Sequence, residues 1–575
     1  MQKKNNVLHN KLFMTISIII VILLAYQANS YTGISLLNDE FGYWSTAAYL
    51  NRLNWNELVG MTPYYAPGYG FVLAVIMKIC PTTVLAYKVA IGLNIFLLWL
   101  SYYFLEKLGR LLFPNLSDNL LIIIGCLSVL VPNLLVYSQY TWPEPFINFL
   151  YIYMTYSLAI FAKNKNVRIL NGGLIAACLL SFLHPRGQFV LIVYLGIILA
   201  YSLYIKKYGV VCLTIFTFGF AMICTSFLKN WALHSIWPET SEYSAVNSVS
   251  FDSTSIYDQI KALFVEPNLF LISIMGKVES SLLMSGFMVI LPFASLIHTM
   301  KRKNRANSTN TIWTLVSIWL ILGFIVMLGL TSARTLFWME RQDNLVYTRY
   351  FDFTVIPLTF MGWGLLKMLP KNKYLYLIVG ISLSLISFPY LVSKIYEIPT
   401  GFNYICSVMF GSLMLLNISS QQLIWGVEIV QLIFLVLLIL VYVKEREKLA
   451  FYVLVIMSFL LNSYAYYAVN QKIINNRLND YSRIADIADY IEGNRIKKIT
   501  YILDSEIESY PYDAKLIQFL DPSLQVSIID EYDENSEENA STVFMLNSRS
   551  DKNNQIQDLY DHKIETDGLS LYNTK

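Results

Sequence analysis

The chain is poor in charge and in the residue patterns that build metal or disulfide sites. Only 14% of its 575 residues are charged, and its net charge is +3. The cysteines form no CxxC pair and lie in or beside apolar segments, so neither a disulfide framework nor a thiolate metal site is indicated. No basic run indicates nucleic acid as a partner. The six cysteines are Cys80, Cys126, Cys178, Cys212, Cys224 and Cys406.

Apolar residues, in contrast, are abundant. Hydrophobic residues account for 56% of the sequence and aromatic residues for 15%, a balance that a soluble domain cannot carry without large exposed apolar patches. Apolar stretches of about 17 to 22 residues recur, and roughly 20 cross a bilayer as a helix. The sequence therefore predicts an α-helical polytopic membrane protein with about thirteen transmembrane helices. The expected spans are 12–28, 85–105, 119–138, 145–162, 169–184, 188–205, 209–228, 279–299, 311–330, 351–369, 374–390, 422–443 and 449–468.

Basic residues predict how the chain is threaded. Short loops rich in Lys and Arg stay in the cytoplasm, and such loops alternate with the expected spans. The first span follows Lys3, Lys4 and Lys11 without a small-residue cleavage site, so we expect a retained anchor. The N-terminus is thus expected in the cytoplasm and the C-terminal part outside the cytoplasmic membrane. The basic loops contain Lys107/Arg110, Lys163/Lys165/Arg168, Lys206/Lys207, Lys301/Arg302/Lys303/Arg305, Lys367/Lys371/Lys373 and Lys444/Arg446/Lys448.

Two apolar stretches, Gly70–Cys80 and Tyr404–Leu416, are too short to span a bilayer. We expect each to lie at the outer surface or to re-enter part way. Residues 29–84 then form one large external loop. The chain divides into a transmembrane unit, residues 1–469, and a soluble extracytoplasmic α/β domain, residues 470–575.

The C-terminal domain is predicted because the long apolar stretches end and are followed by the shorter apolar patterns of an amphipathic helix and of strands. An amphipathic helix carries Leu478, Ile484, Ile487 and Ile491 on one side. The acidic stretch 530–538 lacks regular ligand spacing, so we expect a solvated loop. Strands are expected near 499–503, 526–529 and 543–546, and a helix near 512–520. In the transmembrane unit, the Ser- and Tyr-rich stretch 240–257 is either a mobile flap over a site or simply a long loop.

The large external loop begins with two adjacent acids, Asp39 and Glu40, directly after the first span. Charged groups at bilayer depth cost at least about 2.5–3.5 kcal/mol. Acids kept at the edge of an apolar bundle therefore have two alternative explanations, a function or interfacial capping of the first span.

Aromatic residues follow in the same loop, in MTPYYAPGYGF. Pro63 and Pro67 favour an irregular turn, and Tyr64, Tyr65 and Tyr69 supply aromatic faces with hydroxyl groups. Such a loop suits a sugar, which it binds by stacking and hydrogen bonds. An interfacial aromatic belt has the same composition.

This combination resembles a known family. Asp39-Glu40 with Tyr43, followed by Tyr64-Tyr65-Ala66-Pro67-Gly68-Tyr69, resembles the first external loop of the GT-C glycosyltransferase superfamily. The branch it is most similar to holds the protein O-mannosyltransferases and the bacterial aminoarabinose transferases. Its members take a sugar from a polyprenyl-phosphate or polyprenyl-diphosphate carrier on the outer or lumenal face of the membrane. Thirteen spans and a soluble external domain also resemble that branch.

Three later segments extend the resemblance. YTWPEPF resembles the family's second outer turn, where Glu144 stands at a position that often holds an acid. FLHPRGQF resembles its Arg-Pro turn, but here the order is His184-Pro185-Arg186. VYTRYFDF resembles a late outer segment, so Arg349 and Tyr350 are candidates at the carrier phosphate.

The chemistry of inverting transfer explains these residue types. A base must take the acceptor proton as the hydroxyl attacks the anomeric carbon, and Asp39 is the candidate base. The leaving phosphate needs a cation, and the Arg fork matches phosphate oxygens. Arg349 and Arg186 are the candidates, with Arg334 or Arg341 behind them.

Glu40 and Glu144 are expected to assist Asp39, to orient the acceptor or to hold a divalent ion. Some branches of the family use a metal and others do not, so the metal requirement stays open, with Asp39 and Glu144 as its candidate ligands. His184 is expected to be a structural turn residue. Beyond a divalent ion, no cofactor is expected.

The resemblance implies a glycosyltransferase that moves one sugar from a polyprenyl-phosphate carrier, here undecaprenyl phosphate, to an acceptor outside a bacterial cell. The acceptor is a cell-wall polymer, a lipid-linked glycan or a protein. A polysaccharide polymerase or ligase is an alternative that shares the carrier. A transporter or flippase is a second, but it would place ionisable groups near the middle of several spans.

Overall fold

The computed structural model shows a helical membrane protein with a small C-terminal sheet. It describes residues 10–30, 34–237, 261, 264–301, 308–335, 341–369, 372–399, 401–444, 447–504, 511–529, 543–547, 550, 562–566 and 569–573. The acidic stretch 530–538 and the stretch 240–257, each the subject of a prediction above, lie outside these residues.

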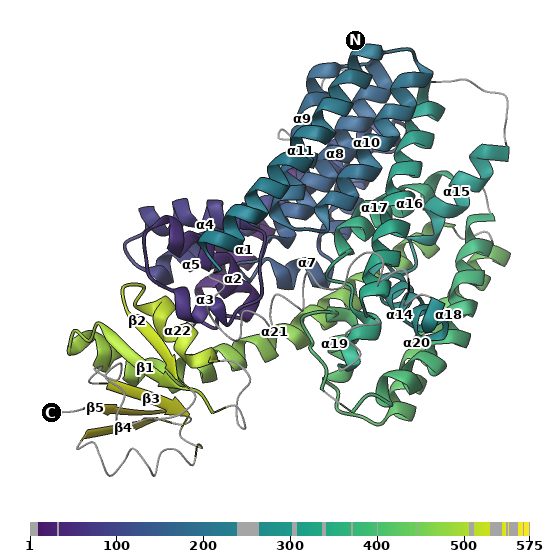
Figure 1. The fold of residues 1–575 in the computed structure, drawn as a ribbon. Helices are drawn as coiled ribbons and strands as arrows, with labels where there is room; N and C mark the ends of the chain where they lie inside the picture. Colours follow the sequence, from purple (N-terminus) through teal and green to yellow (C-terminus); the bar gives the residue numbers. More distant parts are fainter. Residues whose placement is uncertain are drawn as a thin grey trace.

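Helices account for most of the described residues before the C-terminal sheet (Figure 1). In chain order they are α1 Lys11–Ser30, α2 Asn38–Leu50, α3 Asn56–Gly60, α4 Pro67–Ile79, α5 Thr83–Leu112, α6 Asp118–Val129, α7 Pro132–Tyr137, α8 Glu144–Asn164, α9 Val167–Leu183, α10 Gly187–Tyr204, α11 Tyr208–Ser235, α14 Pro267–Ser285, α15 Ile290–Lys301, α16 Ser308–Thr335, the 3₁₀ helix η2 Gln342–Val346, α17 Asp352–Met368, α18 Asn372–Tyr396, α19 Val408–Met414, α20 Ser420–Lys444 and α21 Glu447–Gly493.

Local signals set several helix ends. The side chains of Thr82 and Asn166 cap α5 and α9 by accepting hydrogen bonds from backbone N–H groups of the first turn, which satisfies donors that a helix start leaves open. Helix α8 ends at Lys165, whose φ of 57° is left-handed. The chain can therefore reverse within two residues between α8 and α9.

The apolar helices agree with the predicted fold class. Within the described residues, eight helices are long and apolar enough to cross a membrane, and the bent pair α14 and α15, at 101°, makes a ninth candidate. Eleven of the thirteen expected spans coincide with one of these helices or with α1, α9 or α17. The expected span 119–138 is instead divided between α6 and α7, and 279–299 contains the bend between α14 and α15. The number of crossings therefore stays a prediction. Of the two short stretches, Gly70–Cys80 matches α4 and Tyr404–Leu416 contains α19.

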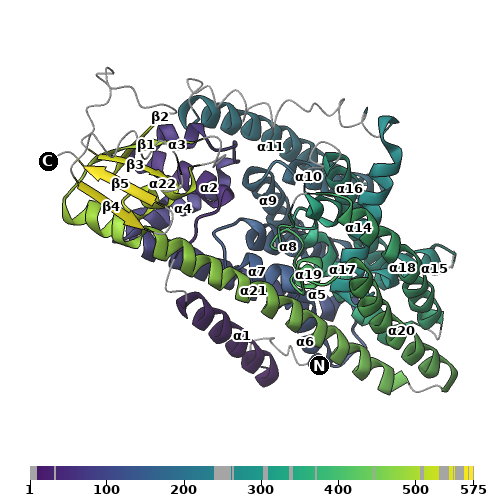
Figure 2. The ribbon, with the colours of Figure 1, turned by 90° about the horizontal axis from the view of Figure 1, so that it is seen from below.

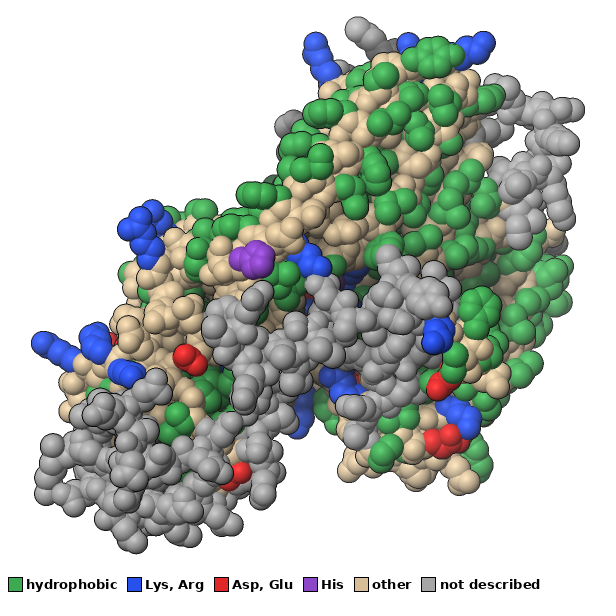
Figure 3. Space-filling view, viewed as in Figure 1, with side chains coloured by type: hydrophobic (Ala, Val, Ile, Leu, Met, Phe, Trp, Pro, Cys, Tyr) green, Lys and Arg blue, Asp and Glu red, His purple; other side chains and the backbone are tan. Residues whose placement is uncertain are grey.

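The space-filling view shows how polar and apolar side chains are distributed. Hydrophobic side chains cover the flanks of the bundle formed by α8 to α11 and α16, and Lys and Arg side chains lie at its upper end (Figure 3). A belt of exposed apolar residues is what a bilayer-embedded bundle presents to lipid.

The carboxyl group of Glu279 is buried between α14, α18 and α20. Glu279 in α14 accepts hydrogen bonds from Ser384 in α18 and from Nε2 of Gln431 in α20, the latter at 3.3 Å. Polar contacts of this kind join helices where no water is present. Glu279 is thus an ionisable residue inside a candidate membrane helix, which is a feature expected of a transporter or flippase.

The C-terminal unit contains a five-stranded mixed sheet in the order β2-β1-β3-β5-β4. Strand β1 pairs in parallel with β2 and β3, and β5 pairs antiparallel with β3 and β4. The expected strands and the helix near 512–520 are all present, and β4 and β5 were not predicted. The elements are β1 Lys498–Ile502, α22 Tyr512–Leu520, β2 Gln525–Ile529, β3 Val543–Asn547, β4 His562–Thr566 and β5 Leu569–Asn573.

Helix α21 connects the two units. It runs without a break past residue 470, where the domain boundary was predicted, and Figure 2 shows it extending along the molecule from α20 to the strands. Ile484, Ile487 and Ile491 are buried, as expected from their spacing. Leu478 is 43% exposed, so its assignment to the same face was wrong. Six residues turn a helix by about 600°, which places Leu478 roughly 120° from Ile484.

Candidate functional site

Four segments that are distant in sequence bring their charged residues to one end of the helices. Glu144 begins α8, where an acid is favoured by the helix dipole. Arg186 directly precedes α10, and Arg349 lies between η2 and α17. Asp39 lies in the first turn of α2. All four were predicted as site residues, and the structure brings them into one cluster.

Ion pairs link this cluster. Nη1 of Arg349 lies 2.5 Å from Oδ2 of Asp39, and its Nε lies 2.8 Å from Oε1 of Glu144. Nη2 of Arg186 lies 3.2 Å from the same Glu144 oxygen, and its Nη1 donates to the backbone carbonyl of Arg349 at 3.3 Å. Although His184-Pro185-Arg186 reverses the family order, Arg186 reaches the cluster. Arg186 binds Glu144 and the backbone of Arg349, and so holds Arg349 in position.

Burial and charge together fix the state of Arg349. Burial alone lowers the pKa of its guanidinium, but the carboxylates of Glu144 and Asp39 outweigh burial and hold the pKa well above its ordinary value. The guanidinium also lies 3.5 Å from the ring centroid of Trp142, a cation–π contact that holds it in place. Arg349 is therefore a fixed positive charge beside Asp39.

Asp39 has a second partner on its other oxygen. The hydroxyl of Tyr65 donates to Oδ1 of Asp39. The Tyr65 ring crosses α2 at Gly42, where an added Cβ would lie 2.0 Å from a ring carbon. Glycine is required here by this close approach. The carboxylate is held by two side chains and is still 28% exposed.

The exposed side of Asp39 faces a cavity of about 330 Å³. Positive charge dominates its wall, which contains Arg334, Arg341 and Arg349, and Arg341 also pairs with Asp343 at 2.9 Å. A cavity with several cations, one carboxylate and aromatic faces suits a ligand that joins an anionic group to a polyhydroxylated one. The wall is formed by Leu37, Asn38, Asp39, Pro63, Tyr65, Trp142, Thr331, Arg334, Arg341, Asn344, Tyr347, Arg349, Tyr350, Asn403 and Cys406.

Glu40 does not face this cavity. It is 0% exposed, and its Oε1 accepts hydrogen bonds from the Tyr87 hydroxyl at 2.8 Å and from the backbone N–H and hydroxyl of Thr141 at 2.7 and 2.8 Å. Arg477 of α21 donates to the Tyr87 hydroxyl at 3.1 Å. Burial raises the pKa of Glu40, with Arg477 acting in the opposite direction. Glu40 thus joins α2 to α5, to the turn before α8 and, through Tyr87, to α21.

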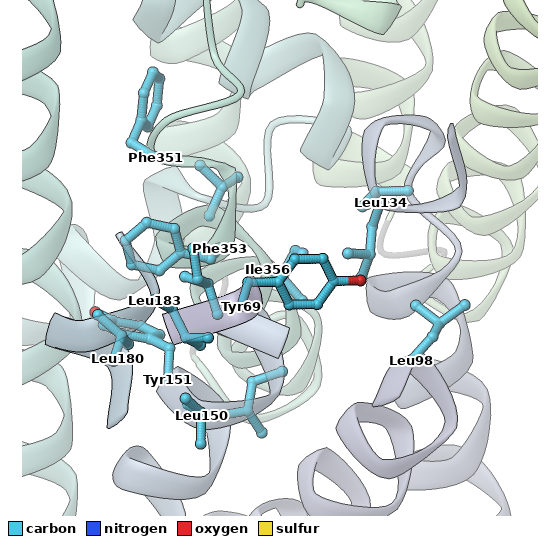
Figure 4. Packing of buried hydrophobic residues seen from close by; sticks show 14 of the residues in the cluster. Tyr69, Leu98, Leu134, Leu150, Tyr151, Leu180, Leu183, Phe351, Phe353 and Ile356 are labelled. Atoms are coloured by element: carbon cyan, nitrogen blue, oxygen red, sulfur yellow. The ribbon is translucent and has the colours of Figure 1, made fainter. Parts of the chain in front are cut away.

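The predicted tyrosines divide in the same way. Tyr65 and Tyr350 line the cavity. Tyr64 packs edge-on against Trp237 at 5.3 Å and lines a small adjoining space. Tyr69 is fully buried, its hydroxyl donates to Asn94 at 3.3 Å, and Figure 4 shows it inside the packed hydrophobic cluster.

Several residues of the site were not singled out in the sequence. Asp352 is buried behind Arg349 and accepts hydrogen bonds from Asn133 at 2.6 Å, Tyr137 at 2.9 Å and Thr348 at 3.3 Å. These bonds fix the segment that carries Arg349. An acid at the start of an apolar helix was a usable signal. No such signal in the sequence marked five other wall residues, because their place in the wall depends on how distant segments pack. They are Trp142, Asn344, Tyr347, Asn403 and Cys406.

The two acids proposed as metal ligands do not fit a divalent ion in this arrangement. The Arg349 guanidinium lies between Asp39 and Glu144 and bonds to both, and a cation in that place opposes a second one. Within the described residues, no three His, Cys, Asp or Glu side chains are grouped so as to hold a metal ion. His184 accepts a hydrogen bond from the backbone N–H of Arg186 at 3.3 Å, as befits a turn residue.

Comparison with known proteins gives matches among solved structures alone. No protein-family model matches the chain, and no curated protein sequence matches it. ArnT from Cupriavidus metallidurans is similar in the apo state, at 13% identity and a TM-score of 0.46 over 98% of this chain and 97% of that one. The same protein bound to undecaprenyl phosphate gives 12% identity and 0.46 over the same shares.

Arabinosyltransferase EmbB from Mycobacterium smegmatis is also similar, at 12% identity and a TM-score of 0.38 over 80% of this chain and 41% of EmbB.

Proposed function

We propose that this chain is an inverting glycosyltransferase that moves a sugar from a polyprenyl-phosphate carrier to an acceptor hydroxyl at the outer face of the cytoplasmic membrane. The observation that carries the proposal is the placement of Asp39. Its carboxylate, held by Tyr65 and Arg349, faces a cavity of about 330 Å³ walled by three arginines.

The position of the cavity suits a lipid-borne substrate. Glu144, Arg186 and Arg349 stand at helix ends, and Arg334 lies in the last turn of α16. The ends of apolar helices mark the boundary between hydrocarbon and headgroups. The basic loops, such as that of Lys163 and Lys165, lie at the opposite ends of the same helices. By the positive-inside rule the cavity is then outside and the N-terminus in the cytoplasm.

The proposed reaction accounts for both the acceptor proton and the leaving phosphate with residues of this cavity. The acceptor oxygen attacks the anomeric carbon while Asp39 takes the acceptor proton, and the bond between that carbon and the carrier phosphate oxygen breaks with its electron pair going to the phosphate. The growing negative charge on the phosphate is stabilised by Arg349, Arg334 and Arg341, so no proton donor is needed for the leaving group. Attack opposite the leaving group inverts the anomeric centre.

The remaining residues take supporting parts in this proposal. Arg349 orients the Asp39 carboxylate, and Glu144 and Arg186 hold Arg349. Tyr65 and Tyr350 supply ring faces for the sugar. Glu40 and Tyr69 support the fold of the loop and do not touch the substrate.

Mass spectrometry of membrane lipids and envelope glycans tests the proposal in cells that lack the chain. We expect one polyprenyl-phosphate sugar to accumulate while one cell-wall polymer, lipid-linked glycan or glycoprotein loses the same sugar. Wild-type chain and the Asp486→Asn control, an exposed site on α21, should reverse both changes, and Asp39→Asn should reverse neither. Loss of a whole repeating glycan would favour a polymerase or ligase, and unchanged carrier lipids with a redistributed solute would favour a transporter.

A further inference from the structure

The C-terminal domain contacts the loop that carries Asp39 through helix α22 and the residues after it, and strand β2 contacts α3. Phe519 packs edge-on against Trp44 of α2 at 5.2 Å. Nε2 of Gln518 donates to the Asn54 carbonyl at 3.3 Å, and Nε1 of Trp55 donates to the Pro522 carbonyl at 3.1 Å. Residues 36–62 are thus in contact with the external domain, although more than 450 residues separate the two in sequence.

Two side chains of α22 reach the start of α2. The Tyr512 hydroxyl accepts from the backbone N–H of Leu36 at 3.2 Å and donates to Asp480 of α21 at 2.9 Å. Nζ of Lys515 donates to Oδ1 of Asn38 at 3.2 Å and to the Met61 carbonyl at 3.3 Å. Asn38 precedes Asp39 and lines the cavity beside it.

Burying the amine of Lys515 costs folding free energy that packing alone does not require. Lys515 is 0% exposed and its Nζ lies 5.5 Å from the Phe41 ring centroid. Burial lowers its pKa to about 7. A methionine of similar length would fill the space without the cost of burying an amine. The amine does what methionine cannot, since it binds Asn38 and the Met61 carbonyl and so joins both sides of the loop.

We infer that Lys515 is a positioning residue, by which the C-terminal domain holds α2 so that the Asp39 carboxylate points into the cavity. The inference rests on the proposed function, because it assigns Lys515 a role in sugar transfer without contact with substrate. A misplacement of about 1 Å at a reacting group costs roughly 100-fold in rate. The domain therefore acts on turnover and not on carrier binding.

The test compares full-length wild type with Lys515→Met, and with Lys498→Met as an exposed lysine of the same domain. The donor is the lipid-linked sugar extracted from cells lacking the chain. We expect Lys515→Met to lower kcat about 10- to 50-fold with KM for the donor within about threefold. Amide hydrogen exchange over residues 34–50 should quicken, while α5 and the sheet exchange as before. Lys498→Met should match wild type in all three readouts.

A double variant tests the path through Asn38. If Lys515 acts through it, Asn38→Ala combined with Lys515→Met should be no more than about twofold slower than the slower single variant. Multiplied losses, an unchanged kcat, or unchanged exchange at 34–50 would each overturn the inference. If Lys515→Met does not fold, Tyr512→Phe replaces it, with a smaller loss of kcat and the same quickened exchange expected.

The two proposals fail in different ways. A wild-type chain that transfers no sugar from any polyprenyl-phosphate donor refutes the proposed function, and the positioning role of Lys515 in transfer falls with it. Normal wild-type transfer with normal kcat in Lys515→Met and Tyr512→Phe refutes the positioning role alone.

Discussion

The adjacent acids Asp39 and Glu40 of helix α2 lie in different environments. Asp39 is 28% exposed, faces the cavity and is bound by the side chains of Tyr65 and Arg349. Glu40 is fully buried and is bound by Thr141 and Tyr87 of the surrounding framework. The comparison teaches that one acid is open to the cavity while its neighbour holds the helix in place.

The largest effect should follow from removing the base. Asp39→Asn keeps the shape of the side chain and cannot take the acceptor proton, so we expect transfer to fall by roughly 10²–10⁴. The thermal midpoint should stay within a few degrees of wild type. Initial rates of sugar transfer by purified protein measure the first quantity, and a fluorescence melt measures the second. Transfer within twofold of wild type would remove Asp39 from the mechanism.

Replacing Glu40, the next residue, should lower the stability of the fold. Glu40→Ala leaves three buried donors, from Thr141 and Tyr87, and the part-buried N–H of Leu37 without their acceptor. This should cost about 3 kcal/mol or more in unfolding free energy. Denaturant titration measures this loss. Glu40→Gln, which keeps one acceptor oxygen, should lose less, and Glu57→Ala at an exposed site should lose almost nothing. A full-stability Glu40→Ala protein with no activity would reverse the roles assigned to the two acids.

Arg349→Lys tests the connection between the cavity and the framework. Lysine keeps the positive charge but cannot bind Asp39 and Glu144 together through a planar fork. We expect the transfer rate to fall about 10- to 100-fold, corresponding to the loss of one charged hydrogen bond of roughly 1.5–3 kcal/mol. Arg168→Lys, at an exposed site at the other end of the bundle, is the matched control. Equal rates for Arg349→Lys and wild type would show that charge alone suffices.

The smallest effect concerns pH. The pKa of Lys515 is lowered from 10.5 to about 7 in the folded chain, so between these values the unfolded chain binds more protons and folding stability rises with pH. From pH 7.5 to 9 the stability of wild type relative to Lys515→Met should increase by about 1–2 kcal/mol. Melts of both proteins across that range measure the difference. A stability difference between the two proteins that stays constant from pH 7.5 to 9 would mean that Lys515 is charged in the fold.

Much of this arrangement was accessible from the sequence. Positive-inside loops and helical lengths brought Asp39, Glu144, Arg186 and Arg349 to one end of the bundle before any contact was known. Apolar runs located the helices because hydrocarbon leaves a chain few other conformations.

The facing of individual side chains was not accessible in the same way. Adjacent residues of a helix point about 100° apart, so only the packing of α2 against the Thr141 turn decides that Asp39 and not Glu40 lines the cavity. Tyr69 is buried for the same reason. Strands β4 and β5 were missed even though an Asp-Gly pair at 567–568, typical of a two-residue hairpin turn, separates them.

The contacts of α22 were also beyond the sequence. Nothing in the residues around Lys515 marks Asn38 as its partner, because a contact across 477 positions depends on how the two units dock. The long helix α21, which enters both units, makes that docking geometry definite.

The most direct measurement follows a carrier lipid through one reaction. Purified wild-type chain is incubated with the lipid fraction from cells that lack it, and mass spectrometry follows the polyprenyl-phosphate sugar and the free polyprenyl phosphate. The account predicts that wild type releases polyprenyl phosphate as the sugar leaves it, and that Asp39→Asn leaves the glycolipid intact. A glycolipid that wild-type chain leaves unchanged in the presence of acceptor, or that Asp39→Asn consumes at the wild-type rate, would contradict it.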